Sequence, residues 1–195
     1  VASQIKEWAD WDKLEKALET NPIVLDCIKT NKMITWNLWG ANPDTPIPIA
    51  EGLDSPLERS QAIIDFCEEF SKKHNIIHQY FVSTNGFWLN DKRVQEFYTK
   101  NPKMHLQLSH DGLGNYVRQG KFDPLYDKEI GPILADFARK GIFDLVNITM
   151  TRQNNSLLAN IAFINKWRAD NGLMNLEHFN VKTNHINDSP YCDHW

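Results

Sequence analysis

The chain has 195 residues, of which 42% are apolar, so it is long and apolar enough for one domain with a buried core and is not a disordered chain. Its formal net charge of −4 gives no general attraction to nucleic-acid phosphates or anionic lipid, and we expect neither partner. No apolar run approaches the ~20 residues of a membrane span, and the first residues lack the order of a secretory signal, so we expect a cytoplasmic protein.

The first half of the chain alternates helical and strand patterns. Apolar residues recur at helical spacing in two stretches, and the second of these begins with an N-cap serine, a proline and a capping-box glutamate. The predicted elements are a helix over about Asp10–Glu19, a strand over Met33–Trp39, a helix from Ser55-Pro56-Leu57-Glu58 to about Lys73, and a strand over Ile76–Ser83.

The second half continues the same alternation. The predicted elements are a short helix at Val94, Phe97 and Tyr98, a strand over Met104–Ser109, a helix over Ile130–Ala138 closed by Lys140 and Gly141, a strand over Asp144–Thr151, a helix from Asn154–Ser156 to Asn171, and a strand over Phe179–Asn184. Strands that alternate with helices predict a parallel sheet joined by right-handed helical crossovers.

Each predicted strand has a polar and an apolar set of side chains at alternate positions. The strands of a parallel sheet that is covered on both faces are near-continuous apolar runs, and these strands are not. The polar set is Thr35, Asn37, His78, Tyr80, Gln107, Ser109, Asn147, Thr149, Thr151, Asn180, Lys182 and Asn184. The apolar set, which we expect to face the helices, is Ile34, Leu38, Ile77, Phe81, Leu106, Leu108, Val146, Ile148, Phe179 and Val181.

The polar set has to face water or a bound ligand, because each buried and unpaired polar group would cost about 1–3 kcal/mol. We therefore expect an α/β fold, a partial (β/α)6 TIM-like open barrel with parallel strands, whose interior holds a polar ligand. An open sheet with one solvent-facing side is the alternative. In either geometry the carboxyl ends of the strands form the site.

Four of these strand ends carry short motifs in a characteristic order. They are an aromatic-Gly-x-x-Pro turn at Trp39–Pro43, Thr84-Asn85-Gly86, Leu-x-Leu-Ser-x-Asp-Gly at Leu106–Gly112, and Thr-x-x-Asn at Thr151–Asn154. Together they resemble the radical S-adenosylmethionine (radical SAM) enzymes over roughly Asp10–Asn184. The resemblance implies a six-stranded partial barrel and cluster-bound S-adenosylmethionine. It also implies one-electron cleavage to an adenosyl radical that abstracts hydrogen from a small-molecule or peptide substrate, with an electron donor as partner.

The resemblance also implies which residues hold the cofactor. They are Gly40, Ala41, Asn42, Pro43, Thr84, Asn85, Ser109, Asp111, Asn147 and Thr149. Relatives have Gly-Gly-Glu-Pro at the first of these turns, so Gly40 and Pro43 match whereas Ala41 and Asn42 depart. The Asn42 amide oxygen can accept a hydrogen bond from the methionyl ammonium, with less electrostatic strength than a carboxylate.

The loop after the third strand supplies the candidate substrate ligands, His110 and Arg118. Arg118 shares this loop with Lys121 and Asp123, and salt bridges within the loop are the alternative role for all three.

The chain lacks the family's C-x-x-x-C-x-x-C loop, which binds the 4Fe-4S cluster. Its three cysteines, Cys27, Cys67 and Cys192, lie too far apart to replace that loop, and their odd number indicates a reducing compartment. We therefore expect the cluster ligands upstream of Val1. The residues 1–195 would then be one barrel domain truncated at its N-terminus and, as a further option, at its C-terminus. No metal site is predicted within the chain, since His185, Cys192 and His194 match no tight ligand spacing.

Two other functions remain open at this stage. A cluster-free barrel could act as a hydrolase or lyase with His110 and Asp111 as acid and base. A degenerate barrel could instead be a non-catalytic module that captures a nucleotide or a peptide.

Overall fold

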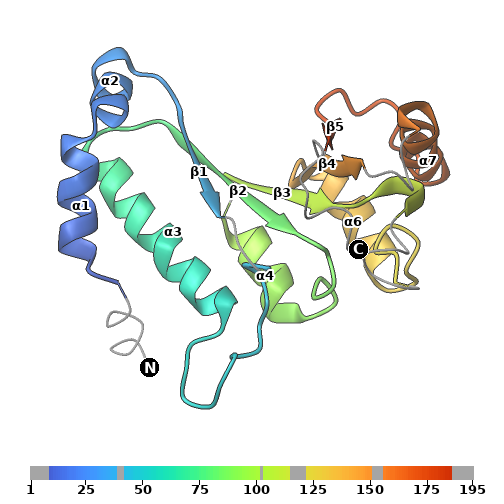
Figure 1. Ribbon diagram of the computed structural model, residues 1–195, viewed down its shortest axis with the longest axis horizontal. Coiled ribbons are helices and arrows are strands. Elements are labelled where there is room, and N and C mark those ends of the chain that lie inside the picture. The colour runs from blue at the N-terminus through green and yellow to red at the C-terminus, as the bar shows by residue number, and fades with distance from the viewer. Residues whose placement is uncertain (1–8, 39–41, 102, 115–121, 151–155, 186–195) are drawn as a thin grey trace. The chain divides into compact units, whose positions relative to one another are not determined.

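The computed structural model describes residues 9–38, 42–101, 103–114, 122–150 and 156–185 (Figure 1). The helices are α1 (Trp11–Thr20), α2 (Pro22–Thr30), α3 (Pro56–Lys73), α4 (Lys92–Lys100), α6 (Ile130–Arg139) and α7 (Leu157–Asp170), with a 3-10 turn η1 (Gly112–Gly114). The strands are β1 (Ile34–Leu38), β2 (His78–Thr84), β3 (Met104–Ser109), β4 (Phe143–Met150) and β5 (Asn180–His185).

The five strands that the structure describes form one sheet in the order β1-β2-β3-β4-β5. The ladders β1–β2, β3–β4 and β4–β5 are parallel. These findings confirm the predicted α/β class and the parallel pairing of strands joined by helices.

The chain divides into two compact units. The first unit comprises Val1–Ser83 and Asp91–His105, and the second comprises Thr84–Asn90 and Leu106–Trp195. The crossover β1-α3-β2 lies within the first unit except for Thr84, the last residue of β2. Helices α6 and α7 and the strands β4 and β5 lie within the second unit. The single domain expected from the sequence stays a prediction.

The first unit is built around α3, whose start was read correctly from the sequence. The Ser55 hydroxyl accepts from the Glu58 amide at 3.2 Å, and the Glu58 carboxylate accepts from the Ser55 amide at 2.8 Å, which completes a capping box. Phe70 of α3 packs with Val24 of α2 and with Ile76. Helix α3 thereby covers the face of the sheet that carries Trp36, whose ring meets Phe70 edge-on.

The core of the second unit contains an aromatic cluster from β4, α7 and the residue that directly precedes β5. The Phe143 ring lies 5.9 Å from Trp167 and 5.0 Å from Phe179, and both Phe143 and Trp167 are almost completely buried. The apolar positions Leu106, Leu108, Val146 and Ile148 are buried as expected. The polar positions Gln107, Ser109, Asn147 and Thr149 alternate with them and stay half-buried on the other face.

The face assignment made for β2 was wrong. His78 and Tyr80 are buried on the helix-facing side, whereas Phe81 is half-buried on the opposite side with Gln79. The reason is Glu68 of α3, whose carboxylate binds His78 Nε2 at 2.8 Å and the Tyr80 hydroxyl at 3.0 Å. A polar partner on the helix therefore stabilises polar side chains on the covered face.

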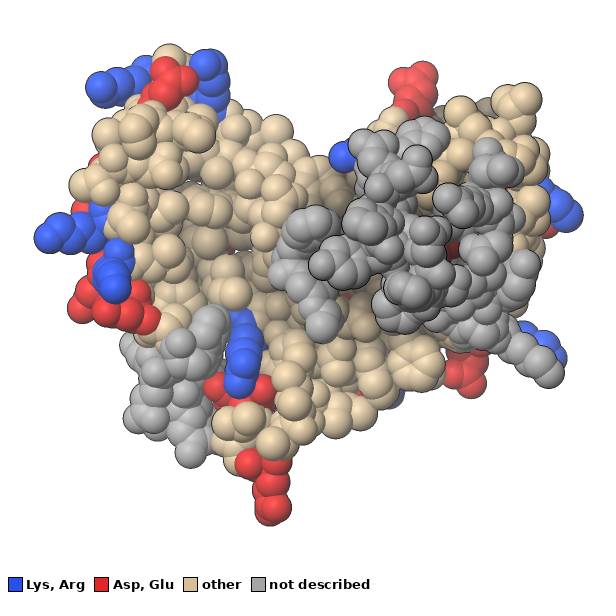
Figure 2. All heavy atoms as spheres, viewed as in Figure 1, with Lys and Arg blue, Asp and Glu red and all other residues tan. Residues whose placement is uncertain are grey.

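The exposed charges mix both signs. On the face shown in Figure 2, acidic and basic side chains of the described residues lie beside one another. Within the described ranges, no helix is long and apolar enough to cross a membrane.

Candidate functional site

The carboxyl end of β3 is followed by a buried histidine whose two ring nitrogens are both engaged. The Gly112 amide donates to His110 Nδ1 at 2.9 Å, so Nε2 carries the proton and donates to Asp123 Oδ1, also at 2.9 Å. Asp123 Oδ1 accepts in addition from the Leu125 amide at 3.0 Å. Through these contacts His110 connects the start of the loop at Gly112 to its end at Asp123.

Position 112 requires a glycine for two reasons, its backbone conformation and the side chain packed against it. Its φ of +59° lies in the left-handed region, and a Cβ at this position would collide with the side-chain amide of Asn160 in α7. Asn160 is almost completely buried and accepts from the Leu113 amide at 3.2 Å. The turn η1 is therefore fixed onto α7 directly after the predicted cofactor residue Asp111, which is also buried.

The carboxyl end of β2 carries the predicted pair Thr84 and Asn85. The Thr84 hydroxyl accepts from the Gly86 amide at 3.0 Å, and the Asn85 side-chain oxygen accepts from the Phe87 amide at 3.0 Å. Gly86 has a φ of +79°, which allows the chain to turn sharply here. These two side chains therefore shape the turn itself.

A row of three polar side chains crosses β3, β4 and β5 on the face opposite to the buried set. The ladder registers place Ser109 beside Asn147 and Asn147 beside Lys182. Ser109 and Asn147 are half-buried and Lys182 is exposed. Neighbouring strands lie about 4.8 Å apart, so the three side chains present a hydroxyl, an amide and an ammonium group within reach of one small molecule. We name these residues the polar row.

Thr149 extends the polar row toward the carboxyl end of β4. It lies two residues beyond Asn147, so the two side chains share a face, and Thr149 is half-buried. The structure thus brings together three of the predicted cofactor residues, Ser109, Asn147 and Thr149.

The turn after β1 belongs to the first unit. Asn42 has a φ of +49°, and Pro43 is buried with its carbonyl accepting from the Ser60 hydroxyl at 2.8 Å. Next to them, the fully buried Asp44 accepts from the Tyr98 hydroxyl at 3.1 Å. The turn is therefore anchored to α3 and α4. Gly40, Ala41, Arg118 and Lys121 lie outside the described residues.

The cysteines within the described ranges do not fit an iron-sulfur cluster. Cys27 lies in α2 and Cys67 is buried in the core-facing side of α3. Burial raises the pKa of the Cys67 thiol to about 12, so this sulfur stays protonated and is a poor metal ligand. Cys192, like His194, lies outside the described residues.

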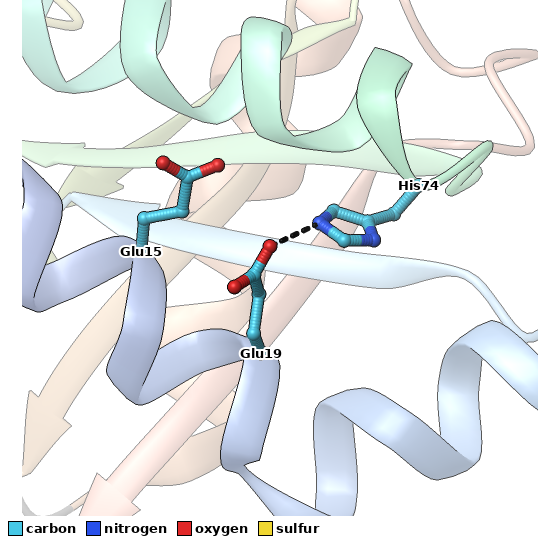
Figure 3. A group of neighbouring side chains, drawn as sticks. All are labelled: Glu15, Glu19 and His74. Atoms are coloured by element: carbon cyan, nitrogen blue, oxygen red, sulfur yellow. Dashed lines mark ion pairs between the residues drawn. The ribbon is translucent and has the colours of Figure 1, made fainter.

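One group of side chains has the composition of a metal site, and it lies in the first unit (Figure 3). Glu15 and Glu19 of α1 point toward His74 at the end of α3, with ligand atoms within 4.8 Å of one another. Lys73 Nζ lies 2.8 Å from a carboxylate oxygen of each glutamate, and its hydrogen bond lowers the pKa of Glu19. The lysine ammonium thus already supplies the positive charge that this group attracts.

Sequence reasoning missed the network around Glu68. Besides His78 and Tyr80, the Lys103 ammonium lies 3.3 Å from Glu68 Oε2 and 3.0 Å from His78 Nε2. Burial alone would raise the pKa of the Glu68 carboxyl, but these hydrogen bonds outweigh burial and lower it. The signal was the polar pair His78 and Tyr80 at alternate positions of β2, which had been assigned to the other face.

No protein-family model matches this chain, and a search of curated proteins also finds no match.

Proposed function

We propose that this chain is the S-adenosylmethionine-binding part of a radical SAM enzyme that acts on a small-molecule or peptide substrate. The observation that carries the proposal is the polar row Ser109, Asn147 and Lys182, which lies on one face of parallel strands and is extended by Thr149. Ligands of parallel α/β proteins bind at the carboxyl ends of such strands. The order of the motifs in the sequence points to this family.

The chemistry of the polar row suits the methionyl and ribose parts of S-adenosylmethionine. The Ser109 hydroxyl and the Asn147 amide can each donate to and accept from ribose hydroxyls. The Lys182 ammonium can form a charge-assisted hydrogen bond with the methionyl carboxylate. The bound cofactor would supply the adenosyl group, and these side chains would orient it.

The 4Fe-4S cluster is not assigned to any residue of this chain. The cysteines that the structure describes do not fit this cluster. The proposal places its ligands upstream of Val1. An electron donor is a partner of the same proposal.

We propose further that the sheet is part of an open (β/α)6 barrel. Strands that follow one another in chain order, each joined to the next by a right-handed crossover, keep all their helices on one face. The opposite face, with its half-buried polar side chains, then forms the interior of a barrel.

Isothermal titration of the chain with S-adenosylmethionine tests the binding. We expect a saturable heat, and we expect Asn147→Ala to weaken binding about tenfold because one ligand hydrogen bond is lost. Gln79→Ala is the control. It removes a half-buried amide from β2 in the first unit, away from the polar row, and should leave the affinity for S-adenosylmethionine unchanged. Absence of binding at about 1 mM ligand would contradict the proposal.

A second candidate, a non-catalytic ligand-binding module, is favoured by the poor fit of the described cysteines to a cluster. A longer chain that includes the preceding residues separates the two functions. The radical SAM proposal predicts brown protein and consumption of S-adenosylmethionine after anaerobic iron-sulfur reconstitution. The binding module predicts the same affinity with no consumption.

A further inference from the structure

Three side chains with metal-binding groups meet where α1 lies beside the end of α3 (Figure 3). Glu15 and Glu19 are four residues apart, so both carboxylates project from the same face of α1. His74 is the C-cap of α3, and its ring centroid lies 4.5 Å from that of Phe70, a contact that restricts the orientation of the imidazole. None of these residues belongs to the proposed cofactor site, which lies on the strands β3, β4 and β5.

The position of His74 Nε2 is a second observation that points to a metal ion. Nε2 lies 3.3 Å from Glu19 Oε1, yet it lacks the geometry of a hydrogen bond to any described residue. Zinc bonds to an imidazole nitrogen or a carboxylate oxygen are about 2.0–2.2 Å long, so two such ligands of a tetrahedral ion lie about 3.3 Å apart without pointing directly at each other. The separation and orientation of these two atoms are therefore those of two ligands of one ion.

The Lys73 ammonium group holds the two carboxylates together in the structure. Its Nζ lies 2.8 Å from Glu15 Oε1 and 2.8 Å from Glu19 Oε1, the oxygen that also faces His74. The Lys73 side chain is 55% exposed, and those of Glu15 and Glu19 are 33% and 36% exposed. When Lys73 turns into solvent, an ion has a path from the carboxylate side to His74 Nε2, which is itself shielded from water.

We propose that Glu15, Glu19 and His74 bind a zinc ion in exchange for the Lys73 ammonium group. Two carboxylate oxygens and one imidazole nitrogen form the ligand set, and water completes the tetrahedron. The imidazole favours zinc over magnesium and calcium, which prefer oxygen ligands alone. The three ligand atoms already lie within 4.8 Å of one another, so rotations of the partly exposed glutamates bring them to bonding distance.

Titration of isotope-labelled protein with zinc chloride near neutral pH, followed by NMR, tests this proposal. We expect saturable shifts of the His74 ring signals and of the carboxyl carbons of Glu15 and Glu19, whereas magnesium should shift none of them. Zinc binding that leaves the His74 ring signals in place would show that the ion lies elsewhere and would overturn the site. Absence of any saturable shift would overturn it as well.

Exchange with a lysine distinguishes this site from ordinary zinc binding at a surface. Lys73→Met removes the competing positive charge and should tighten zinc binding about tenfold. Lys100→Met is the matched control, because it removes a lysine from an exposed ion pair with Glu96 on α4, and it should bind zinc like the unchanged protein. Equal affinity of Lys73→Met and the unchanged protein would overturn the proposed exchange.

Two further variants test the ligands themselves. Glu19→Gln and His74→Asn should each weaken zinc binding about tenfold, because each loses one ligand of the ion. Glu96→Gln and His178→Asn are matched controls, which change an exposed glutamate of α4 and an exposed histidine of the second unit. Circular dichroism checks that every variant is folded. Unchanged zinc affinity in Glu19→Gln or in His74→Asn would overturn the ligand set.

Discussion

At the scale of single residues, the structure predicts that Gly112 cannot be replaced without a clear loss of stability. Gly112→Ala should destabilise the protein by about 2–4 kcal/mol, because an alanine both adopts a φ of +59° unfavourably and collides with Asn160. Urea unfolding, followed by circular dichroism, measures this loss.

Gly141 is a matched control for Gly112. It also has a positive φ, +72°, but a Cβ there meets nothing within 4 Å. Gly141→Ala should therefore cost only about 1 kcal/mol, from the backbone alone. Equal losses in the two variants would show that Asn160 moves aside and does not fix the turn.

The hydrogen bond between His110 and Asp123 is expected to stabilise the folded protein, and variants of Asp123 test this. Asp123→Ala should cost about 1–3 kcal/mol, because it leaves the buried His110 Nε2–H and the Leu125 amide without their acceptor. Asp123→Asn keeps an acceptor oxygen and should cost less than half as much. The measurement is the urea midpoint of each variant, and equal losses would contradict the assigned tautomer.

At the scale of elements, Glu68 connects α3 to β2 and its pKa is lowered in the folded state. The stabilisation it provides is therefore present above the ordinary pKa of 4.5 and is lost as the pH falls through the folded value. Glu68→Gln should cost about 1 kcal/mol near neutral pH, a small value because the carboxylate is partly exposed.

The test of this prediction is urea unfolding of both proteins as the pH is lowered. The difference between Glu68→Gln and the unchanged protein should shrink below about pH 4.5. Glu96→Gln, from an exposed pair, should show no such trend. A difference that stays constant with pH would show that packing, and not charge, accounts for the loss.

Most helices and strands could be predicted from short stretches of sequence, because the residues that cap a helix lie next to it in the chain. Ser55 and Ser156 cap α3 and α7 as expected, and β3 has the predicted bounds. Helix α2 was not predicted, because a proline, Pro22, shortly follows the first predicted helix and commonly marks the end of a helix. Pro22 is instead the first residue of α2, with Asn21 as the cap that accepts from two amides.

Residues of the candidate site could be predicted only where the alternation of polar and apolar residues along a strand determines which face of the sheet each side chain occupies. Ser109 and Asn147 lie beside apolar neighbours that must be buried, so their orientation follows from the strand period. His78 and Tyr80 could not be placed in this way, because their partner Glu68 comes from another element. The approach of His74 to Glu19 likewise depends on how the end of α3 lies beside α1.

At the scale of the whole molecule, strands β3 and β4 have one covered apolar face and one face with half-buried polar side chains. Leu108→Ala should cost about 2–5 kcal/mol, because Leu108 is completely buried on the covered face. Gln107→Ala, one residue earlier on the polar face, should cost less than about 1 kcal/mol. Comparable losses in urea unfolding would contradict this division of the sheet.

The strand order has a consequence for how the protein is made. Because each of the described strands β1 to β4 pairs with the next described strand along the chain, each new ladder needs only the preceding strand and the helix between them. Such a sheet can grow by successive addition while the polypeptide leaves the ribosome, without waiting for a distant segment to be synthesised. We therefore expect folding to begin during translation, from the N-terminal strands onward.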